Sequence, residues 1–264
     1  MSAYVFRPPQ DKAVPIVVSI PHTGVELAPD TAAAFADPAT TALPMTDWHL
    51  HQLYDFLPTL GVTTLHARYS RYVIDLNRAP DGAALYPGRF ETGLVPLETF
   101  DGEPIFREPP DAGAIEGLRR LYHAPYHQRL AAVLDAFEAE QGTVVLIDAH
   151  SVASRANRIH PALDHDIYLG NRDGESCDAW LIDTVGEVFA DHGYRVRCND
   201  PYKGGFITQH YGKRPGVAAL QIEMCQRLYM NEDDPAVATP ANFEQMQNCL
   251  VTLFATLAAV LERN

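Results

Sequence analysis

The stretch 143–151 reads TVVLIDAHS. It begins as an uninterrupted apolar run and ends in polar side chains. A short apolar run without polar alternation is typical of a strand that is buried on both faces of a sheet. We therefore predict a buried strand over Thr143–Ala149, with His150 and Ser151 directly after it.

Further short apolar runs predict the other strands of this sheet. They are Val14–Ile20, Val62–His66, Arg71–Leu76, Asp166–Leu169, Arg195–Cys198 and Val217–Glu223. Segments with helical periodicity lie between them and predict helices over Asp47–Leu60, Ala112–Gln141 (with a break near Pro125), Glu175–His192 and Asn242–Glu262. Strands that alternate with helices predict an α/β fold. We expect a three-layer α/β/α sandwich with a mixed, mostly parallel sheet.

The chain of 264 residues is long enough for one large domain or two small ones. No shift in composition marks a boundary, so we expect residues 1–264 to form a single domain. Residues 80–110 are rich in proline and glycine and show no clear period. A loop of that length inside a compact domain is often a lid or a substrate-binding excursion.

The formal net charge is −14, from 20 Lys and Arg against 34 Asp and Glu. This balance argues against a nucleic-acid partner or an anionic membrane surface, because both need a cationic face. An anionic small molecule would have to be held by local arginines. No apolar run approaches the length of a membrane span, and the first residues lack the apolar core of a signal peptide. We therefore expect a cytoplasmic protein whose four cysteines stay reduced.

Polar side chains follow several of the predicted strands. His22 follows the first, Asn77 and Arg78 follow another, His150 follows the strand at 143–149, and Glu223 ends the last. In buried parallel sheets, ligands bind outside the carboxyl ends of the strands. The sequence therefore predicts a ligand site formed by these residues.

Zinc hydrolases commonly use two histidines and one carboxylate as ligands and leave a fourth position for water. His22 and His150 can supply the imidazoles, and Asp47 or Glu26 the carboxylate. A further carboxylate that takes a proton from water could be Glu223. Each residue also has a purely structural interpretation: the histidines in turns or the core, Asp47 at a helix start, and Glu223 in a buried ion pair.

Four motifs occur in a fixed order, namely SIPHTG at 19–24, SRYVIDLNR at 70–78, DAHS at 148–151 and QIE at 221–223. Together they resemble the N-formylglutamate amidohydrolase family. The resemblance extends from about residue 15 to residue 224, and the run at 70–78 is its most specific part. The family is similar in design to the zinc carboxypeptidases and the aspartoacylase-like deacylases, and the resemblance implies a fold of that kind.

The resemblance also implies roles for individual residues. His22 and His150 would be metal ligands, and Glu223 would be the general base. The third ligand would be Asp47 rather than Glu26. The resemblance implies an acidic residue just before the first helix, which matches Asp47, whereas the spacing from His22 to Glu26 differs from the carboxypeptidase pattern. The metal would be one divalent ion, with zinc expected and Mn, Fe or Co also compatible with these ligands.

The implied substrate is N-formyl-L-glutamate, which is hydrolysed to formate and L-glutamate in a route of histidine degradation. It is a small dicarboxylate N-acyl amino acid. Asn77 and Arg78 would bind one carboxylate. Arg71 comes first for the other, although the odd spacing from Arg78 places the two on opposite faces of a regular strand. Further candidates are Arg155, Arg158 and Arg214, and His210 or Tyr211 as residues that line the pocket.

Two other functions are compatible with these residues. One is another zinc-dependent N-acyl amino acid deacylase or a carboxypeptidase, which would differ in the size of the pocket. The other is a metal-free binding protein for small acidic ligands, which would use the same arginines without catalysis. The oligomeric state stays open.

Overall fold

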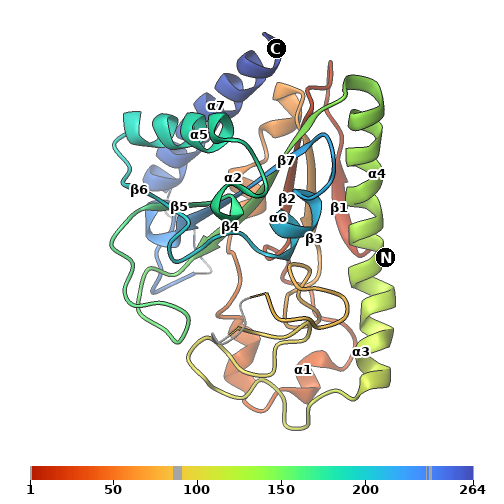
Figure 1. Cartoon of the computed structure of the whole chain (residues 1–264). Helices are drawn as coiled ribbons and strands as arrows, with labels where there is room; N and C mark the ends of the chain where they lie inside the picture. Colours follow the sequence, from red (N-terminus) through yellow and green to blue (C-terminus); the bar gives the residue numbers. More distant parts are fainter. Residues whose placement is uncertain (1, 86–90, 236, 238–239, 264) are drawn as a thin grey trace.

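A computed structural model describes residues 2–85, 91–235, 237 and 240–263. Seven strands in this part of the chain form one sheet, in the order β1-β3-β2-β4-β7-β5-β6 (Figure 1). The strands are β1 (Tyr4–Arg7), β2 (Ile16–Ile20), β3 (Thr63–Ala67), β4 (Val144–Val152), β5 (Ile167–Gly170), β6 (Val196–Cys198) and β7 (Val217–Cys225).

The sheet is mixed and mostly parallel, as predicted. The four neighbouring strands β3, β2, β4 and β7 run parallel to one another. β1 pairs antiparallel with β3, β5 pairs antiparallel with β7, and β6 lies parallel to β5 at the other edge. The carboxyl ends of the four central strands therefore meet on the same side of the sheet, where a ligand site is expected.

Helices cover both faces of the sheet. α4 runs along one face, and α5 and α7 lie on the other (Figure 1). The helices are α1 (Thr31–Ala34), α2 (Leu50–Leu53), α3 (Ala112–Leu118), α4 (Ala124–Gln141), α5 (Ala179–Asp191), α6 (Phe206–Tyr211) and α7 (Pro240–Leu261). Within the ranges described above, no helix combines the length and the apolarity that crossing a bilayer requires.

The core consists of one apolar layer on each face of the sheet. Side chains alternate across a strand, so Val145 and Ile147 of β4 pack with α5 and α7, whereas Val144 and Leu146 pack with α4. All four are buried. The prediction of a three-layer α/β/α sandwich is confirmed, and the central strands are buried on both faces because each layer of helices covers one.

The predicted strand Arg71–Leu76 is wrong, because these residues form buried turns. The Val73 amide donates to Ser70 O, and the Asp75 amide donates to Leu94 O in a loop. Residues 71–76 are therefore buried without pairing to a neighbouring strand. The sequence alone does not distinguish a buried strand from a buried turn. β1 was not predicted, since only its pairing with β3 makes this short segment a strand.

Two predicted helices differ in detail. Asp47–Leu60 contains only α2 and a 3₁₀ turn at Leu57–Leu60. His49 has a positive φ of 57°, and Pro58 has no amide hydrogen to donate. Ala112–Gln141 stays helical throughout, through one wider turn at Arg119–His123, because Pro125 falls in the first turn of α4.

The predicted loop at 80–110 lies partly outside the described residues, since 86–90 are not described. Residues 80–85 and 91–110 contain neither a helix nor a strand of the sheet. Isolated bridges join Glu98 to Pro104 and Phe35 to Phe106. This stretch lies at the carboxyl side of the sheet, together with α1 (Figure 1).

Gly24 permits the close approach of two loops at this end of the sheet. A Cβ atom at this position would lie 2.3 Å from the carbonyl oxygen of Tyr69. Gly24→Ala should therefore force the backbone apart and lower the free energy of unfolding by about 1–3 kcal/mol, as measured by urea denaturation. Gly117→Ala in α3 is the matched control, because a Cβ there meets no atom within 4 Å. A Gly24→Ala protein as stable as the Gly117→Ala protein would contradict this view of the loop contact.

Candidate metal and substrate site

Three parallel strands bring polar side chains to one end of the sheet. His22 follows β2, while His150 and Glu223 lie near the ends of β4 and β7. The register places His150 directly opposite Glu223. All three side chains are buried. Residues that are far apart in the sequence therefore meet because adjacent parallel strands end at the same edge.

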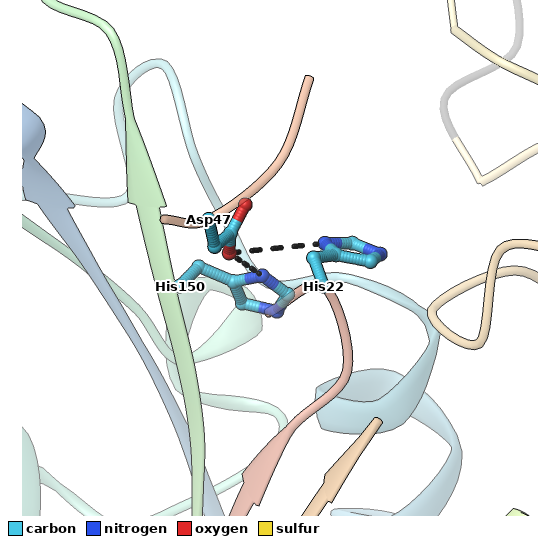
Figure 2. Close-up of side chains that lie close together, drawn as sticks. All are labelled: His22, Asp47 and His150. Atoms are coloured by element: carbon cyan, nitrogen blue, oxygen red, sulfur yellow. Dashed lines mark hydrogen bonds and ion pairs between the residues drawn. The ribbon is translucent and has the colours of Figure 1, made fainter. Parts of the chain in front are cut away.

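His22, Asp47 and His150 form a compact group that could hold a metal ion. Figure 2 shows both imidazoles turned toward the carboxylate of Asp47. Oδ2 of Asp47 lies 3.2 Å from Nδ1 of His150 and 3.9 Å from Nδ1 of His22. One potential ligand atom from each residue lies within 4.8 Å of the other two. Two imidazole nitrogens and a carboxylate oxygen are a donor set that suits zinc.

Each histidine meets a second buried carboxylate through its other ring nitrogen. Nε2 of His22 lies 2.6 Å from Oδ1 of Asp75, and Nε2 of His150 lies 3.1 Å from Oδ1 of Asp148. At His22 this hydrogen bond holds the imidazole in the tautomer and orientation that leaves Nδ1 available to a metal, whereas Nε2 of His150 also lies 2.8 Å from Nδ2 of Asn77. The residues present therefore fit a divalent cation at His22, Asp47 and His150.

Burial and neighbouring charges shift the titration of these groups in different directions. Burial, followed by the nearby Arg71, lowers the pKa of His22. Burial also disfavours a charged His150, but Asp148 and Asp47 outweigh it and hold the pKa of His150 well above its usual value. Burial raises the pKa of Glu223 to about 8. A carboxyl group with this pKa is mostly protonated at neutral pH unless a cation lies nearby.

A cavity of about 390 Å³ opens over this group. Its lining combines the histidines and carboxylates with cationic and aromatic side chains. Besides His22, Asp47, His150 and Glu223, the lining includes Arg71, Asn77, Arg78, Phe100, Arg158, His160, Tyr202 and Gln221. Three arginines in one cavity of an otherwise acidic protein give a local site for an anion.

Arg71 lies deep in this cavity and is 6% exposed. Its Nη2 lies 2.6 Å from Oδ2 of Asp75, and its guanidinium lies 5.2 Å from the centre of the Phe100 ring. Among the described residues, its buried Nε has no hydrogen-bond partner. Because residues 71–76 are not a strand, the strand alternation that separated Arg71 from Arg78 does not apply, and both side chains line the same cavity.

The Asn77 side chain is fixed by hydrogen bonds within the protein. Its Oδ1 accepts from the Ile207 amide at 2.7 Å, and its Nδ2 donates to Oδ2 of Asp148 at 3.1 Å. A Cβ atom at position 205 would lie 2.3 Å from Nδ2 of Asn77, so this contact requires Gly205. Asn77 thus connects the segment after Asp75 to β4 and α6.

Arg78 points into the cavity with its guanidinium already oriented. Its Nε donates to Thr92 O at 2.7 Å, and its Nη2 donates to Oγ1 of Thr92 at 3.1 Å. Two histidines at the start of α4 hold the backbone on either side of Asn77. Nε2 of His123 lies 2.9 Å from Arg78 O, and Nε2 of His127 lies 2.8 Å from Leu76 O.

The other predicted site residues lie in different places. Glu26 is exposed and pairs with Arg68, and it is not part of the His22–His150 group, so Asp47 is the carboxylate that joins the histidines. His210 lines an adjoining cavity of about 310 Å³ with Arg78 and Phe206. Of the remaining candidate arginines, Arg158 lines the main cavity. Arg155 and Arg214 do not: Arg155 is exposed, and Arg214 pairs with Asp135 and Glu138.

Sequence reasoning did not single out several residues that complete the site. Asp75 and the α4 histidines are the clearest cases. A charged residue inside the apolar run 71–76 was a signal for Asp75. Gln221 belongs to the QIE motif but was assigned no role, and no motif pointed to Tyr202; both line the cavity.

The family model and the similar proteins of known name point to the same family. The N-formylglutamate amidohydrolase family model matches residues 14–230. An N-formylglutamate deformylase from Pseudomonas aeruginosa is 42% identical over 226 residues, which cover 84% of each chain. An N-formylglutamate deformylase from Pseudomonas putida is 39% identical over the same shares.

Solved structures agree at the level of the fold. The crystal structure of an N-formylglutamate amidohydrolase from Ralstonia eutropha JMP134 has a TM-score of 0.85 at 26% identity, covering 100% of this chain and 99% of that one. A gene product from Agrobacterium tumefaciens has a TM-score of 0.71 at 18% identity, covering 96% of both chains, and this likeness concerns the fold alone. The family match over most of the sequence, together with the relatives above 30% identity, shows that this chain belongs to the N-formylglutamate amidohydrolase family.

Proposed function

We propose that this protein hydrolyses N-formyl-L-glutamate to formate and L-glutamate, using a divalent metal ion held by His22, Asp47 and His150. The observation that carries the proposal is the buried His-Asp-His group at the floor of a cavity that also contains Glu223 and three arginines. The names of the two Pseudomonas relatives support this substrate. Zinc suits the donor set best, and Mn, Fe or Co would also be accepted by imidazole and carboxylate ligands.

The metal would act as a Lewis acid on the formyl oxygen and make water a better nucleophile near neutral pH. Glu223 would take one proton from the attacking water while the oxygen of that water bonds to the formyl carbon. When the carbon–nitrogen bond breaks, Glu223 would return that proton to the leaving amine, and the second proton of the water, lost from formic acid, would convert the amine to ammonium and leave formate. Burial raises the pKa of Glu223 to about 8, so it would act as a base at neutral pH only with a cation nearby, and a metal ion at the His-Asp-His group would supply that charge.

The cationic side chains would hold the two carboxylates of the substrate. Arg78, oriented by Thr92, would bind one of them, and Asn77 would act with it. Arg71 would meet the second carboxylate through its buried Nε, and the same charge would stabilise an oxyanion nearby. His210 would contribute from the adjoining cavity.

The proposed setting is the cytoplasm, in a route that degrades histidine. The four cysteines are free, and three of them are buried, which is compatible with a compartment that keeps thiols reduced. The proposed ligand is a small dicarboxylate, and the net charge of −14 argues against nucleic acid or an anionic membrane as a partner. The fold is proposed to act as one domain.

Formate release from N-formyl-L-glutamate tests the reaction directly. Purified protein should release formate, lose this activity after chelation, and regain it when Zn²⁺ is added back. N-acetyl-L-glutamate should react much more slowly if the enzyme is a deformylase. Release that persists after complete metal removal would contradict the metal-dependent mechanism. Metal-loaded protein that cleaves only other N-acyl amino acids or peptides would assign it to a related deacylase or carboxypeptidase.

Glu223→Gln tests the proposed base. The amide cannot accept the proton of water, so kcat should fall by about 100- to 10,000-fold. Metal content, measured by atomic emission, should stay close to that of the wild type because Glu223 is not a proposed ligand. If this variant turns over at the normal rate, another group must be the base.

Arg78→Ala tests recognition of a carboxylate. Loss of the guanidinium should raise KM for N-formyl-L-glutamate by about 10- to 100-fold, since a charged hydrogen bond contributes roughly 1.5–3 kcal/mol. Neutral formyl amides should be affected much less. Arg214→Ala is the matched control, because its guanidinium pairs with Asp135 and Glu138 outside the cavity. Equal losses on charged and neutral substrates would mean that Arg78 only supports the local structure.

A further inference from the structure

Asp47 is the proposed ligand with the least regular backbone around it. Residues 43–49 belong to neither a helix nor a strand. Leu43 and His49, at the two ends of this segment, both have positive φ values, 50° and 57°. Residues other than glycine pay an energetic penalty in this conformation and keep it only when their surroundings enforce it. The segment therefore depends on contacts from elsewhere to hold the Asp47 carboxylate beside the two histidines.

Some of those contacts come from His22, Arg71 and Tyr72, and the ones that flank Asp47 in the chain come from the turn that follows β7. Nε2 of Gln226 donates to the carbonyl oxygen of Thr46 at 3.0 Å. The Tyr229 hydroxyl donates to the carbonyl oxygen of Trp48 at 2.9 Å. Thr46 and Trp48 are the two neighbours of Asp47 in the chain, so these bonds hold the backbone immediately before and after the ligand.

Ser151 joins the same network to the carboxylate itself. Its backbone amide donates to Oδ2 of Asp47 at 3.0 Å. Its hydroxyl lies 2.8 Å from that of Tyr229 and 3.3 Å from Nε2 of Gln226. The Tyr229 hydrogen is used on Trp48 O, which can only accept, so Ser151 donates to Tyr229 and accepts from Gln226. Every hydroxyl hydrogen of Ser151 and Tyr229 and every side-chain amide hydrogen of Gln226 then has an acceptor.

The network is shielded from water. Ser151 is 5% exposed, Gln226 is 7% exposed and Tyr229 is fully buried. A buried polar group that loses its partner costs more free energy than an exposed one, so each bond here strongly favours the observed arrangement. Gln226 and Tyr229 also follow Glu223 on the same stretch of chain. The end of β7 thus carries the proposed base and fixes the segment of the proposed ligand.

We infer that Gln226 and Tyr229 are positioning residues that set Asp47 in place for metal binding before the metal arrives. They touch neither the substrate nor the metal in this role, and the inference rests on the proposed metal site. Without them, the Asp47 segment would become ordered only when the metal binds. The free energy of that ordering would then lower the affinity for the metal.

Tyr229→Phe tests this role with a closely matched control. The substitution removes one hydroxyl and keeps the ring in the core. Tyr54→Phe removes the same atom from another fully buried tyrosine of the same apolar cluster, whose hydroxyl has no hydrogen-bond partner among the described residues. Gln226→Leu provides a second, independent variant that removes both donors while keeping a side chain of similar size.

Two measurements distinguish a positioning role of Gln226 and Tyr229 from a general contribution to protein stability. In metal-free protein, amide hydrogen exchange over residues 43–49 should be faster in Tyr229→Phe and Gln226→Leu than in Tyr54→Phe. Competition with a fluorescent chelator should show a Kd for Zn²⁺ that is about 10- to 100-fold higher in the first two variants, against less than about a twofold change in the control. At saturating Zn²⁺, turnover of Tyr229→Phe should approach that of Tyr54→Phe.

The outcomes distinguish this inference from the proposed reaction. Unchanged exchange and unchanged Zn²⁺ affinity in both variants would overturn the positioning role and leave the reaction standing. Wild-type protein that binds Zn²⁺ in these assays but releases no formate would overturn the reaction and leave the positioning role standing. Wild-type protein that binds no Zn²⁺ would overturn both the metal site and the role assigned to Gln226 and Tyr229.

Discussion

Four buried carboxylates at one end of the sheet impose the strongest constraint on this fold. Asp75 and Asp148 are fully buried, and Asp47 and Glu223 are only 2% and 7% exposed. An ionised carboxylate away from water is very costly unless cations or hydrogen-bond donors surround it. The architecture around the cavity is largely the set of groups that meet this requirement.

The compensation is uneven. Asp75 is served by Arg71, His22 and the Asn77 amide, and these partners hold its pKa well below the usual value although burial acts in the opposite direction. For Glu223, burial dominates and the pKa rises to about 8. A carboxyl group with that pKa is mostly protonated at neutral pH, so Glu223 avoids the cost of burial by staying uncharged. A divalent cation at the proposed His-Asp-His site would favour the ionised form of Glu223, which is the form that can act as a base.

Much of this arrangement could be predicted from the sequence because strand ends are local features. The runs at 14–20, 143–149 and 217–223 correspond to β2, β4 and β7, and parallel pairing then brings His22, His150 and Glu223 to one edge. Because side chains alternate along a strand, a shift of one residue between β4 and β7 would turn Glu223 away from His150. Both strands are buried on both faces and lack polar alternation, so the apolar pattern predicts the strands but not the register that pairs His150 with Glu223.

The parts that could not be predicted depend on contacts between distant segments. The run 71–76 has the composition of a strand, but it lies in turns whose backbone bonds go to Ser70 and Leu94. His123, just before α4, and His127, in its first turns, were assigned no role from the sequence, yet they hold Arg78 O and Leu76 O. The segment around Asp47 has backbone angles that no local preference favours. Tertiary contacts override local propensity in each case, and two of the three are directly beside the proposed site.

The charge distribution also has consequences for an anionic ligand. The chain carries a net charge of −14, and ionic screening limits that field to about 8 Å at physiological salt. Capture of a dicarboxylate must therefore occur at short range, by arginines that are already oriented: Arg71 through Asp75, and Arg78 through Thr92. In the proposed reaction, cleavage of the amide converts a neutral nitrogen into an ammonium group inside a cavity lined by three arginines. The nitrogen receives its proton from Glu223 in this reaction, so the new ammonium group forms beside the carboxylates of the cavity, while the arginines face the carboxylates of the substrate.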